Sequence, residues 1–380
     1  MSKQTITGRL PESGESVALE VEAGHIVAVR TGPADETRYI SAGLVDLQVN
    51  GYCGQDINAG TLRVEEVSAL CRALLKEGVT AFLPTIITSS PEKILCALRA
   101  ISAARQQDGI AEAMICGVHL EGPSISPQDG PRGAHPAEHI RPPDLAEFAR
   151  WQQASGNLVR LVTLSPHFPD CGHYIRALVQ QGVRVSLGHT HSSHQQIVDA
   201  VEAGASLSTH LGNGAHGTLP RHPNYLWSQL AEDRLTAMLI ADGHHLPDEV
   251  LTVMLRAKGT EKAILVSDTA MAGGLPPGDY DTPVGGKVTL EPGGRLGLTG
   301  SPFLAGAALP LRFGVGRCAG LPGISLTIAL NMAVANPARL LNKSYGTVPG
   351  SVADLIRFRW APGQPALEID QAWLAGHPQL

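Results

Sequence analysis

Eight short runs of apolar and β-branched residues recur along the middle of the chain, each followed by polar side chains and then by an amphipathic stretch that ends at a glycine. Such runs are typical of strands buried on both faces of a parallel sheet. The amphipathic stretches predict helices, because a glycine suits the residue just past a helix end. The predicted strands span residues 43–50, 79–85, 114–121, 159–165, 183–189, 207–210, 236–242 and 262–268.

This alternation predicts an α/β fold, a (β/α)8 barrel over residues 43–344. Eight strand–helix units over about 250 residues are what such a barrel requires. The stretch 324–342 is predicted to be helical and to close the barrel. A doubly wound open sheet is the alternative, but it normally has fewer strands and a glycine-rich nucleotide loop, which the sequence does not contain.

The two ends of the chain carry a different pattern. Residues 1–42 and 345–380 alternate apolar and polar positions between turn signals, which is typical of exposed strands. The two segments therefore predict one small β domain, formed by both termini, beside the barrel. A further hairpin is expected within residues 285–300.

Composition narrows the range of partners. The chain has 380 residues, of which 43% are hydrophobic and 17% charged, and this excludes a disordered chain. A net charge of −6 without a basic cluster predicts a small-molecule partner, not nucleic acid or a membrane surface. Six cysteines without paired spacing, and a start without an apolar export segment, predict a cytoplasmic protein. No uninterrupted apolar run is long enough to predict a membrane-spanning helix.

Polar side chains that could bind a metal follow three of the predicted strands. Glu121, His189 and His210 come at the ends of the third, fifth and sixth strands, and the carboxyl ends of barrel strands meet on one face. A single histidine at such a position is more often a structural hydrogen-bonding group. Two imidazoles and a carboxylate together are the ligand set of an open catalytic zinc site, where bound water ionises near neutral pH.

Asp268 ends the last predicted strand, within the apolar run LVSD. It could cap a following helix, since aspartate before small residues often does so. It could also act as a general base that takes a proton from water and returns it to a leaving amine. The neighbouring metal-ligand candidates favour the second interpretation.

Several phrases, in this order, resemble the N-acetylglucosamine-6-phosphate deacetylases of the amidohydrolase superfamily: GLVDLQVNG, GVHLEGP with GAHP, VSLGHT, STHLGN, IADGHH, LVSDTAMAGG and LTGS. The resemblance runs from about residue 40 to 355. It implies a metal-dependent (β/α)8 TIM barrel with a small β-sandwich domain formed by both termini. It also implies hydrolysis of N-acetylglucosamine 6-phosphate to glucosamine 6-phosphate and acetate.

The resemblance further implies the role of each site residue. Glu121, His189 and His210 would be the metal ligands, Asp268 the catalytic acid and base, and His135 a second catalytic residue that steadies the amide oxygen or a sugar hydroxyl. In the family, the arginine that matches Arg221 can come from the neighbouring subunit, so a homodimer is expected. The substrate-binding residues it implies are Ala134, Asn213, Gly214, Arg221, Asp242, His245, Leu298, Thr299 and Gly300.

The first strand departs from many amidohydrolases, because Gln48 and Asn50 stand where an H-x-H motif would bind a second metal. Amides are poor zinc ligands. We therefore expect one divalent metal per chain, zinc first, with iron, manganese or cobalt as alternatives. The missing H-x-H motif, and the absence of a lysine at the end of the fourth strand, also argue against ring-opening or deaminating amidohydrolase reactions.

The segment after Asn213 departs from the family as well, since Gly214, Ala215 and His216 replace a short apolar residue and Met-Pro. His216 and His222 are either polar groups close to the sugar or surface-loop residues, and His244 is an extra histidine. The substrate therefore stays open between N-acetylglucosamine 6-phosphate, N-acetylgalactosamine 6-phosphate and an unphosphorylated acetylamino sugar. Arg221 favours a phosphate. A non-catalytic sugar-phosphate binding protein is the least favoured alternative.

Overall fold

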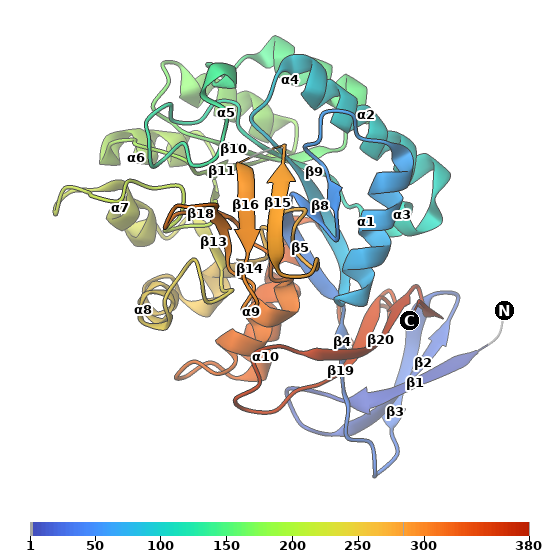
Figure 1. Ribbon diagram of the computed structural model, residues 1–380. Coiled ribbons are helices and arrows are strands. Elements are labelled where there is room, and N and C mark those ends of the chain that lie inside the picture. The colour runs from blue at the N-terminus through green and yellow to red at the C-terminus, as the bar shows by residue number, and fades with distance from the viewer. Residues whose placement is uncertain (1–2, 284, 380) are drawn as a thin grey trace.

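Eight parallel strands curl into a barrel at the centre of the molecule (Figure 1). The computed structural model describes residues 3–283 and 285–379. Every hydrogen-bonded neighbour within the barrel sheet is parallel, which confirms the barrel and excludes the doubly wound alternative. In order around the barrel the strands are β5 (Leu44–Val49), β8 (Val79–Ile87), β9 (Val118–Glu121), β10 (Val159–Leu164), β11 (Arg184–Leu187), β12 (Leu207–Ser208), β13 (Thr236–Ile240) and β14 (Ala263–Val266).

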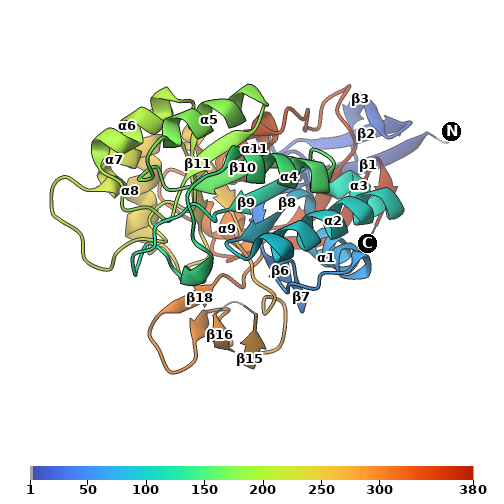
Figure 2. The same cartoon turned by 90° about the horizontal axis from the view of Figure 1, so that it is seen from above.

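Helices cover the outside of the barrel (Figures 1 and 2). Their starts follow from local chemistry: the Ser90 hydroxyl accepts the Lys93 amide at the start of α2, and Ser193 forms a capping box with Gln196 at the start of α6. The helices are α1 (Val64–Lys76), α2 (Pro91–Gln107), α3 (Gly109–Met114), α4 (Leu145–Ser155), α5 (Cys171–Gln180), α6 (His194–Glu202), α7 (Tyr225–Ala231), α8 (Asp248–Lys258), α9 (Leu311–Cys318), α10 (Leu326–Ala333) and α11 (Ala335–Leu340), with short 3₁₀ turns η1 (Ala137–His139) and η2 (Thr260–Lys262).

The barrel strands are buried on both faces. Their outward side chains form one large core with the helices, and their inward side chains form a second core along the barrel axis. Polar side chains begin where the strands end, because the inward positions there open into a cavity instead of the apolar core. The inward core contains Val45, Leu47, Ala81, Leu83, Leu161, Leu207, Met238, Ile240, Ile264 and Val266.

The buried carboxylate of Asp46 joins the first and last strands, where the barrel closes. Its Oδ1 atom accepts the amides of Gln48 at 3.3 Å and Ser267 at 3.2 Å. Its Oδ2 atom has no hydrogen-bond partner within the described part of the chain. Burial raises the pKa of Asp46 to about 6, because the charged form loses its hydration. Where the first and last strands meet, the folded protein therefore disfavours the charged form of Asp46 at neutral pH.

Replacing Asp46 with asparagine is expected to stabilise the metal-free protein above pH 6. Because the pKa of Asp46 is raised in the folded state, the contribution of this residue to the free energy of unfolding is fully present below about pH 4. That contribution is lost as the pH rises to about 6. A pKa raised by about two units corresponds to about 2–3 kcal/mol of free energy of unfolding. The D46N variant should therefore be more stable than the parent protein by about this amount at pH 7.5, and equally stable at pH 4. Urea unfolding across this range tests the expectation, with the exposed Asp233→Asn as control. A gain that does not change with pH would contradict it.

The two ends of the chain form one seven-stranded sheet beside the barrel (Figure 1). β4 (Tyr39–Ala42) joins the two ends, because it pairs with β1 in parallel and with β19 in antiparallel orientation. The sheet has its own apolar core, to which Leu19, Ile40 and Leu355 belong. The other strands are β1 (Gln4–Arg9), β2 (Ser16–Glu22), β3 (His25–Thr31), β19 (Leu355–Arg359), β20 (Glu368–Leu374) and β21 (His377–Pro378).

A four-stranded antiparallel sheet, here called the flap sheet (residues 278–306), projects from one end of the barrel (Figure 2). It contains β15 (Gly278–Thr282), β16 (Gly286–Leu290), β17 (Leu296–Leu298) and β18 (Leu304–Gly306). The sequence predicts only the hairpin of its middle strands. A further two-stranded ribbon, β6 (Gly51–Tyr52) and β7 (Gln55–Asp56), follows β5.

The stretch 324–342 forms two helices, α10 and α11, where the sequence predicts one. The chain breaks at Val334, whose φ of −130° and ψ of −74° are not helical. Pro337 explains the break, because it has no amide to bond to the carbonyl of Ala333 in a continuous helix. None of the helices in the described chain has the length and apolar character needed to cross a membrane.

Candidate metal centre and active site

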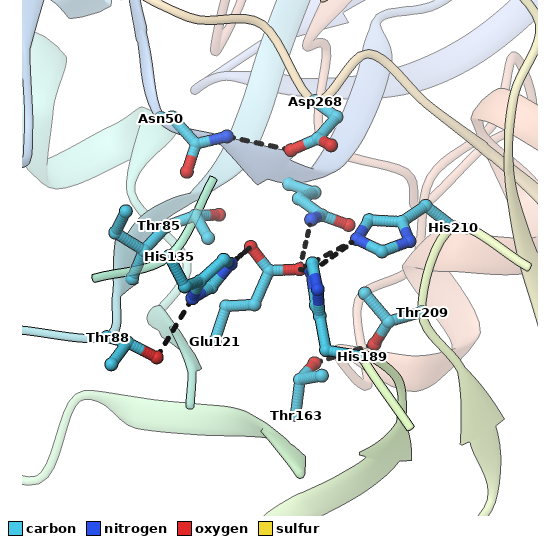
Figure 3. A network of polar contacts seen from close by, with 12 residues as sticks. Asn50, Thr85, Thr88, Glu121, His135, Thr163, His189, Thr209, His210 and Asp268 are labelled. Atoms are coloured by element: carbon cyan, nitrogen blue, oxygen red, sulfur yellow. Dashed lines mark hydrogen bonds and ion pairs between the residues drawn. The ribbon is translucent and has the colours of Figure 1, made fainter. Parts of the chain in front are cut away.

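Three buried side chains meet at the carboxyl ends of the strands, as the sequence predicts (Figure 3). Glu121 Oε1 lies 3.0 Å from His210 Nε2 and 3.3 Å from His189 Nε2, and the two Nε2 atoms are 3.0 Å apart. Ligand atoms around a tetrahedral zinc, each about 2.0–2.1 Å from it, lie about 3.3 Å from one another. The donor set and its spacing therefore fit a divalent metal with a further position free.

Neighbouring groups orient these ligands. The Nδ1–H of His189 donates to the carbonyl of Pro131 at 2.8 Å, so its Nε2 lone pair faces Glu121 and His210. His189 has a φ of +47° and His210 a φ of +26°, which is left-handed backbone that side chains rarely adopt. Such backbone occurs where a site fixes the conformation of a residue.

The two amides on the first strand hold carboxylates in place. Gln48 Nε2 donates to Glu121 Oε1 at 2.8 Å. Asn50 Nδ2 donates to Asp268 Oδ1 at 2.7 Å, and Figure 3 shows these two side chains facing each other. Sequence reasoning identifies these amides only as poor metal ligands, because their partners lie 73 and 218 residues away. In the structure, each amide donates to a carboxylate of the candidate site.

Asp268 lies at the end of β14 and faces the same cavity as the three metal-ligand candidates. The residues after it do not begin a helix, so the helix-cap interpretation is wrong. Burial, and then the nearby Glu121 carboxylate, raise the pKa of Asp268 to about 8. A divalent cation beside it would favour the carboxylate and oppose this shift. Asp268 is therefore a buried carboxyl group that can hold or release a proton near neutral pH.

His135 faces Glu121 from the loop after β9 (Figure 3). Its Nδ1 atom lies 2.9 Å from the Thr88 hydroxyl, and its Nε2 atom lies 3.8 Å from Glu121 Oε2. Burial, and then the neighbouring His189, lower the pKa of His135 to about 3, so the ring is neutral. If the Thr88 hydroxyl donates to Nδ1, the Nε2–H can donate to a substrate oxygen.

A cavity of about 450 Å³ opens above these groups, and its volume suits a small ligand. Beside the metal-ligand candidates and Asp268, its walls carry five of the other predicted residues, namely Ala134, His135, Asn213, Gly214 and His245. Gly214 is required to be glycine, because a Cβ there would lie 2.8 Å from His189 Nδ1.

Asp242 stands behind His245 instead of lining the cavity. Its Oδ2 atom accepts the Nδ1–H of His245 at 2.8 Å, and its Oδ1 atom accepts the amides of His244 and His245. This contact leaves Nε2 of His245 for a ligand. Burial by itself would raise the pKa of Asp242. The hydrogen bonds from His245 and from the two backbone amides outweigh burial and lower this pKa to about 2.

The predicted residues Leu298, Thr299 and Gly300 are not on the cavity wall. Leu298 ends β17, and Thr299 and Gly300 follow it in the turn toward β18, where the Thr299 amide donates to the carbonyl of Lys287. The flap sheet lines the cavity instead with Val288, Leu296 and residues 302–306. The small residues of PFLAGA are the only sequence signal that could have identified the last segment.

Arg221 and His222 do not line the cavity. Arg221 and His222 are exposed, and no partner for Arg221 occurs among the described residues. His119, which precedes Glu121 by two residues on β9, is fully buried, and its ring contacts the Leu47 carbonyl and the Thr163 hydroxyl. His119 is therefore a structural hydrogen-bonding group of the barrel interior.

Comparisons with known proteins agree with this geometry. A sequence model of the amidohydrolase family matches residues 39–276. An N-acetylglucosamine-6-phosphate deacetylase of Bacillus subtilis is 34% identical over 85% of this chain and 81% of its own length. An N-acetylgalactosamine-6-phosphate deacetylase of Escherichia coli O157:H7 is 32% identical over 94% of this chain and 93% of its own length.

Solved structures agree as well. A variant N-acetyl-D-glucosamine-6-phosphate deacetylase from Mycobacterium smegmatis, in complex with N-acetyl-D-glucosamine 6-phosphate, superposes with a TM-score of 0.88 at 25% identity and covers 100% of both chains. An N-acetylglucosamine-6-phosphate deacetylase from Thermotoga maritima superposes with a TM-score of 0.85 at 25% identity over 99% of both chains.

Proposed function

The chain belongs to the N-acetylglucosamine-6-phosphate deacetylases of the amidohydrolase family, and from this premise we propose that it hydrolyses N-acetylglucosamine 6-phosphate to glucosamine 6-phosphate and acetate. The observation that carries the proposal is the buried set of Glu121, His189 and His210, with Asp268 facing the same cavity. A protein that only bound sugar phosphates would not need a carboxylate base beside a metal site.

N-acetylgalactosamine 6-phosphate is the second candidate substrate, and one observation favours it. The deacetylases named for that sugar in Escherichia coli O157:H7 and Shewanella align with 94% and 95% of this chain, whereas the Bacillus subtilis relative aligns with 85%. The two sugars share the acetamide and the phosphate, so both would use the same reacting groups.

We propose one divalent metal per chain, held by Glu121, His189 and His210, with zinc the first expectation and iron, manganese or cobalt as alternatives. When bound, the metal would polarise the acetamide carbonyl and make a water molecule more acidic. A single metal is favoured because Gln48 and Asn50 already use their amides on carboxylates.

Asp268 carries the proton in the proposed reaction. Its carboxylate takes a proton from water while the water oxygen bonds to the amide carbon, and Asn50 holds Oδ1 during this step. The C–N bond then breaks as Asp268 passes the proton to the amine nitrogen, and acetate leaves. The Nε2–H of His135 would donate to the developing oxyanion.

The substrate would be oriented by groups further along the cavity. We assign the sugar to the wall of Ala134, Asn213 and Gly214, and the phosphate to His245 Nε2. The exposed guanidinium of Arg221 would reach the phosphate of a neighbouring copy in a homodimer. All six cysteines are unpaired in the described chain, which supports a reducing cytoplasm.

Acetate release from four compounds tests the function. Metal-loaded protein is incubated with N-acetylglucosamine 6-phosphate, N-acetylgalactosamine 6-phosphate and both unphosphorylated sugars. The first compound is expected to have the highest kcat/KM. Preference for the second would move the assignment to the galactose series. Preference for the free sugars, or no turnover of any compound, would overturn the phosphate-dependent function.

Arg221→Ala is expected to raise KM for a 6-phosphate substrate by about 10- to 100-fold, because a charge-assisted phosphate contact is lost. KM for the unphosphorylated sugar should change by less than about threefold. Arg176→Ala, which removes another exposed arginine, serves as the control. Equal effects on both substrates would mean that Arg221 does not contact phosphate.

A further inference from the structure

Two loops that line the cavity touch each other where Gly130 and Ala215 form part of its wall. The β9 loop (residues 122–136) carries Ala134 and His135, and the β12 loop (residues 209–224) carries Asn213 and Gly214. At Gly130, whose φ is +90°, an added Cβ would lie 2.9 Å from the Cα of His216. The backbones of the two loops are therefore in direct contact.

The side chain of His216 joins three segments at this contact. Its Nε2 atom lies 3.0 Å from Gln128 Oε1 on the β9 loop, and its Nδ1 atom lies 3.0 Å from the Tyr225 hydroxyl. The backbone amide of His216 donates to the same hydroxyl oxygen at 2.8 Å. Every polar group of this set is satisfied if Nε2 donates to Gln128 and the Tyr225 hydroxyl donates to Nδ1.

Tyr225 gives this junction a rigid base. It is buried at the first position of α7, and Asn224 caps that helix by accepting the amides of Leu226 and Trp227. His216 therefore connects a helix of the barrel wall, through its own loop, to the β9 loop. It is one of the two histidines for which the sequence leaves a surface-loop role open, and the structure places it at a loop junction instead.

We propose that His216 is a positioning residue, which fixes the β9 loop against the β12 loop and thereby sets the width of the substrate cavity. The inference rests on the proposed function for its effect on catalysis. The metal-ligand candidates and Asp268 stand at strand ends, and His135 keeps its Thr88 contact, so none of the reacting side chains contacts His216. The β9 loop supports His189 through the carbonyl of Pro131, so metal content is measured beside the kinetics. The loss of His216 should therefore weaken substrate binding more than it slows the chemical step.

His216→Ala is expected to raise KM for the acetylated sugar phosphate by about tenfold while kcat changes by less than about threefold. Gln128→Ala, at an exposed position that does not endanger folding, should have a similar effect. The double variant should be no worse than His216→Ala alone, because the contact with Gln128 is already lost with the His216 side chain. The exposed His173→Ala is the matched control and should behave as the parent protein.

Two kinetic outcomes would overturn the inference. One is a fall in kcat without a rise in KM for His216→Ala at unchanged metal content. The other is a pair of KM effects that multiply in the double variant, which would show that Gln128 and His216 act independently.

Hydrogen–deuterium exchange separates this inference from the proposed function. In His216→Ala, amides in both residues 122–136 and residues 212–224 should exchange faster than in the parent protein, whatever the substrate is. Faster exchange in the β12 loop alone would overturn the junction. A parent protein that hydrolyses none of the four sugars would overturn the proposed function, and the exchange result would still decide the role of His216.

Discussion

Replacing Asp268 with asparagine is expected to lower kcat by about three to four orders of magnitude while the metal stays bound. Positioned proton transfer contributes about 10²- to 10⁴-fold, and Asp268 is assigned both proton transfers of the reaction. Asparagine has nearly the same shape, and its Oδ1 atom can still accept the amide of Asn50. The substitution therefore removes the base without removing a contact that holds the site together.

Single-turnover rates and metal content, measured on the same samples, test this expectation. Asp233→Asn, which changes an exposed aspartate outside the cavity, is the control. A D268N variant that keeps more than about a tenth of the parent kcat would mean that another group moves the proton. Loss of metal together with activity would instead make Asp268 a ligand.

The pH profile gives a second, independent test of Asp268. Its carboxylate must be charged to accept a proton, so kcat/KM should rise with pH along an acidic limb. Burial raises the pKa of Asp268 to about 8 in the metal-free site, and a bound cation should lower it. The limb is therefore expected below pH 8, and it should be absent from the residual activity of D268N.

The barrel could be predicted from the sequence because strands buried on both faces leave continuous apolar runs. Each predicted strand overlaps one of the observed barrel strands, from β5 to β14. The sequence predicts only part of the flap sheet, because β15 and β18 are short, exposed or half-buried strands without such runs. The apolar pattern predicts one helix across α10 and α11, although Pro337 is a signal for the break between them.

The part of the candidate site that could be predicted depends on one rule, which is that the carboxyl ends of barrel strands meet on one face. That rule brings together Glu121, His189 and His210. It does not reach contacts set by loop paths, such as that between His216 and Gln128. It also does not give the path of the flap sheet, which turns residues 302–306 toward the cavity instead of Leu298, Thr299 and Gly300.

Removing one imidazole from the metal site is the other change with a very large expected effect. His210→Ala should reduce the bound metal from about one equivalent per chain to a small fraction, and kcat/KM by at least about 10³-fold. The two remaining ligand atoms, from Glu121 and His189, leave too few protein donors for a tight tetrahedral site. Elemental analysis of chelator-treated and reloaded protein measures the first quantity, and acetate release measures the second.

Two further measurements test the same metal site, namely the number of metal ions per chain and the melting temperature of the protein. Added zinc should raise the melting temperature of the parent protein, because an ion that binds only the folded chain stabilises it by mass action. His210→Ala should lose this increase, whereas His173→Ala should keep it. A second bound equivalent in the parent protein would contradict the assignment of Gln48 and Asn50 as amides that hold carboxylates. An H210A variant that is inactive but still metal-loaded would exclude His210 as a ligand.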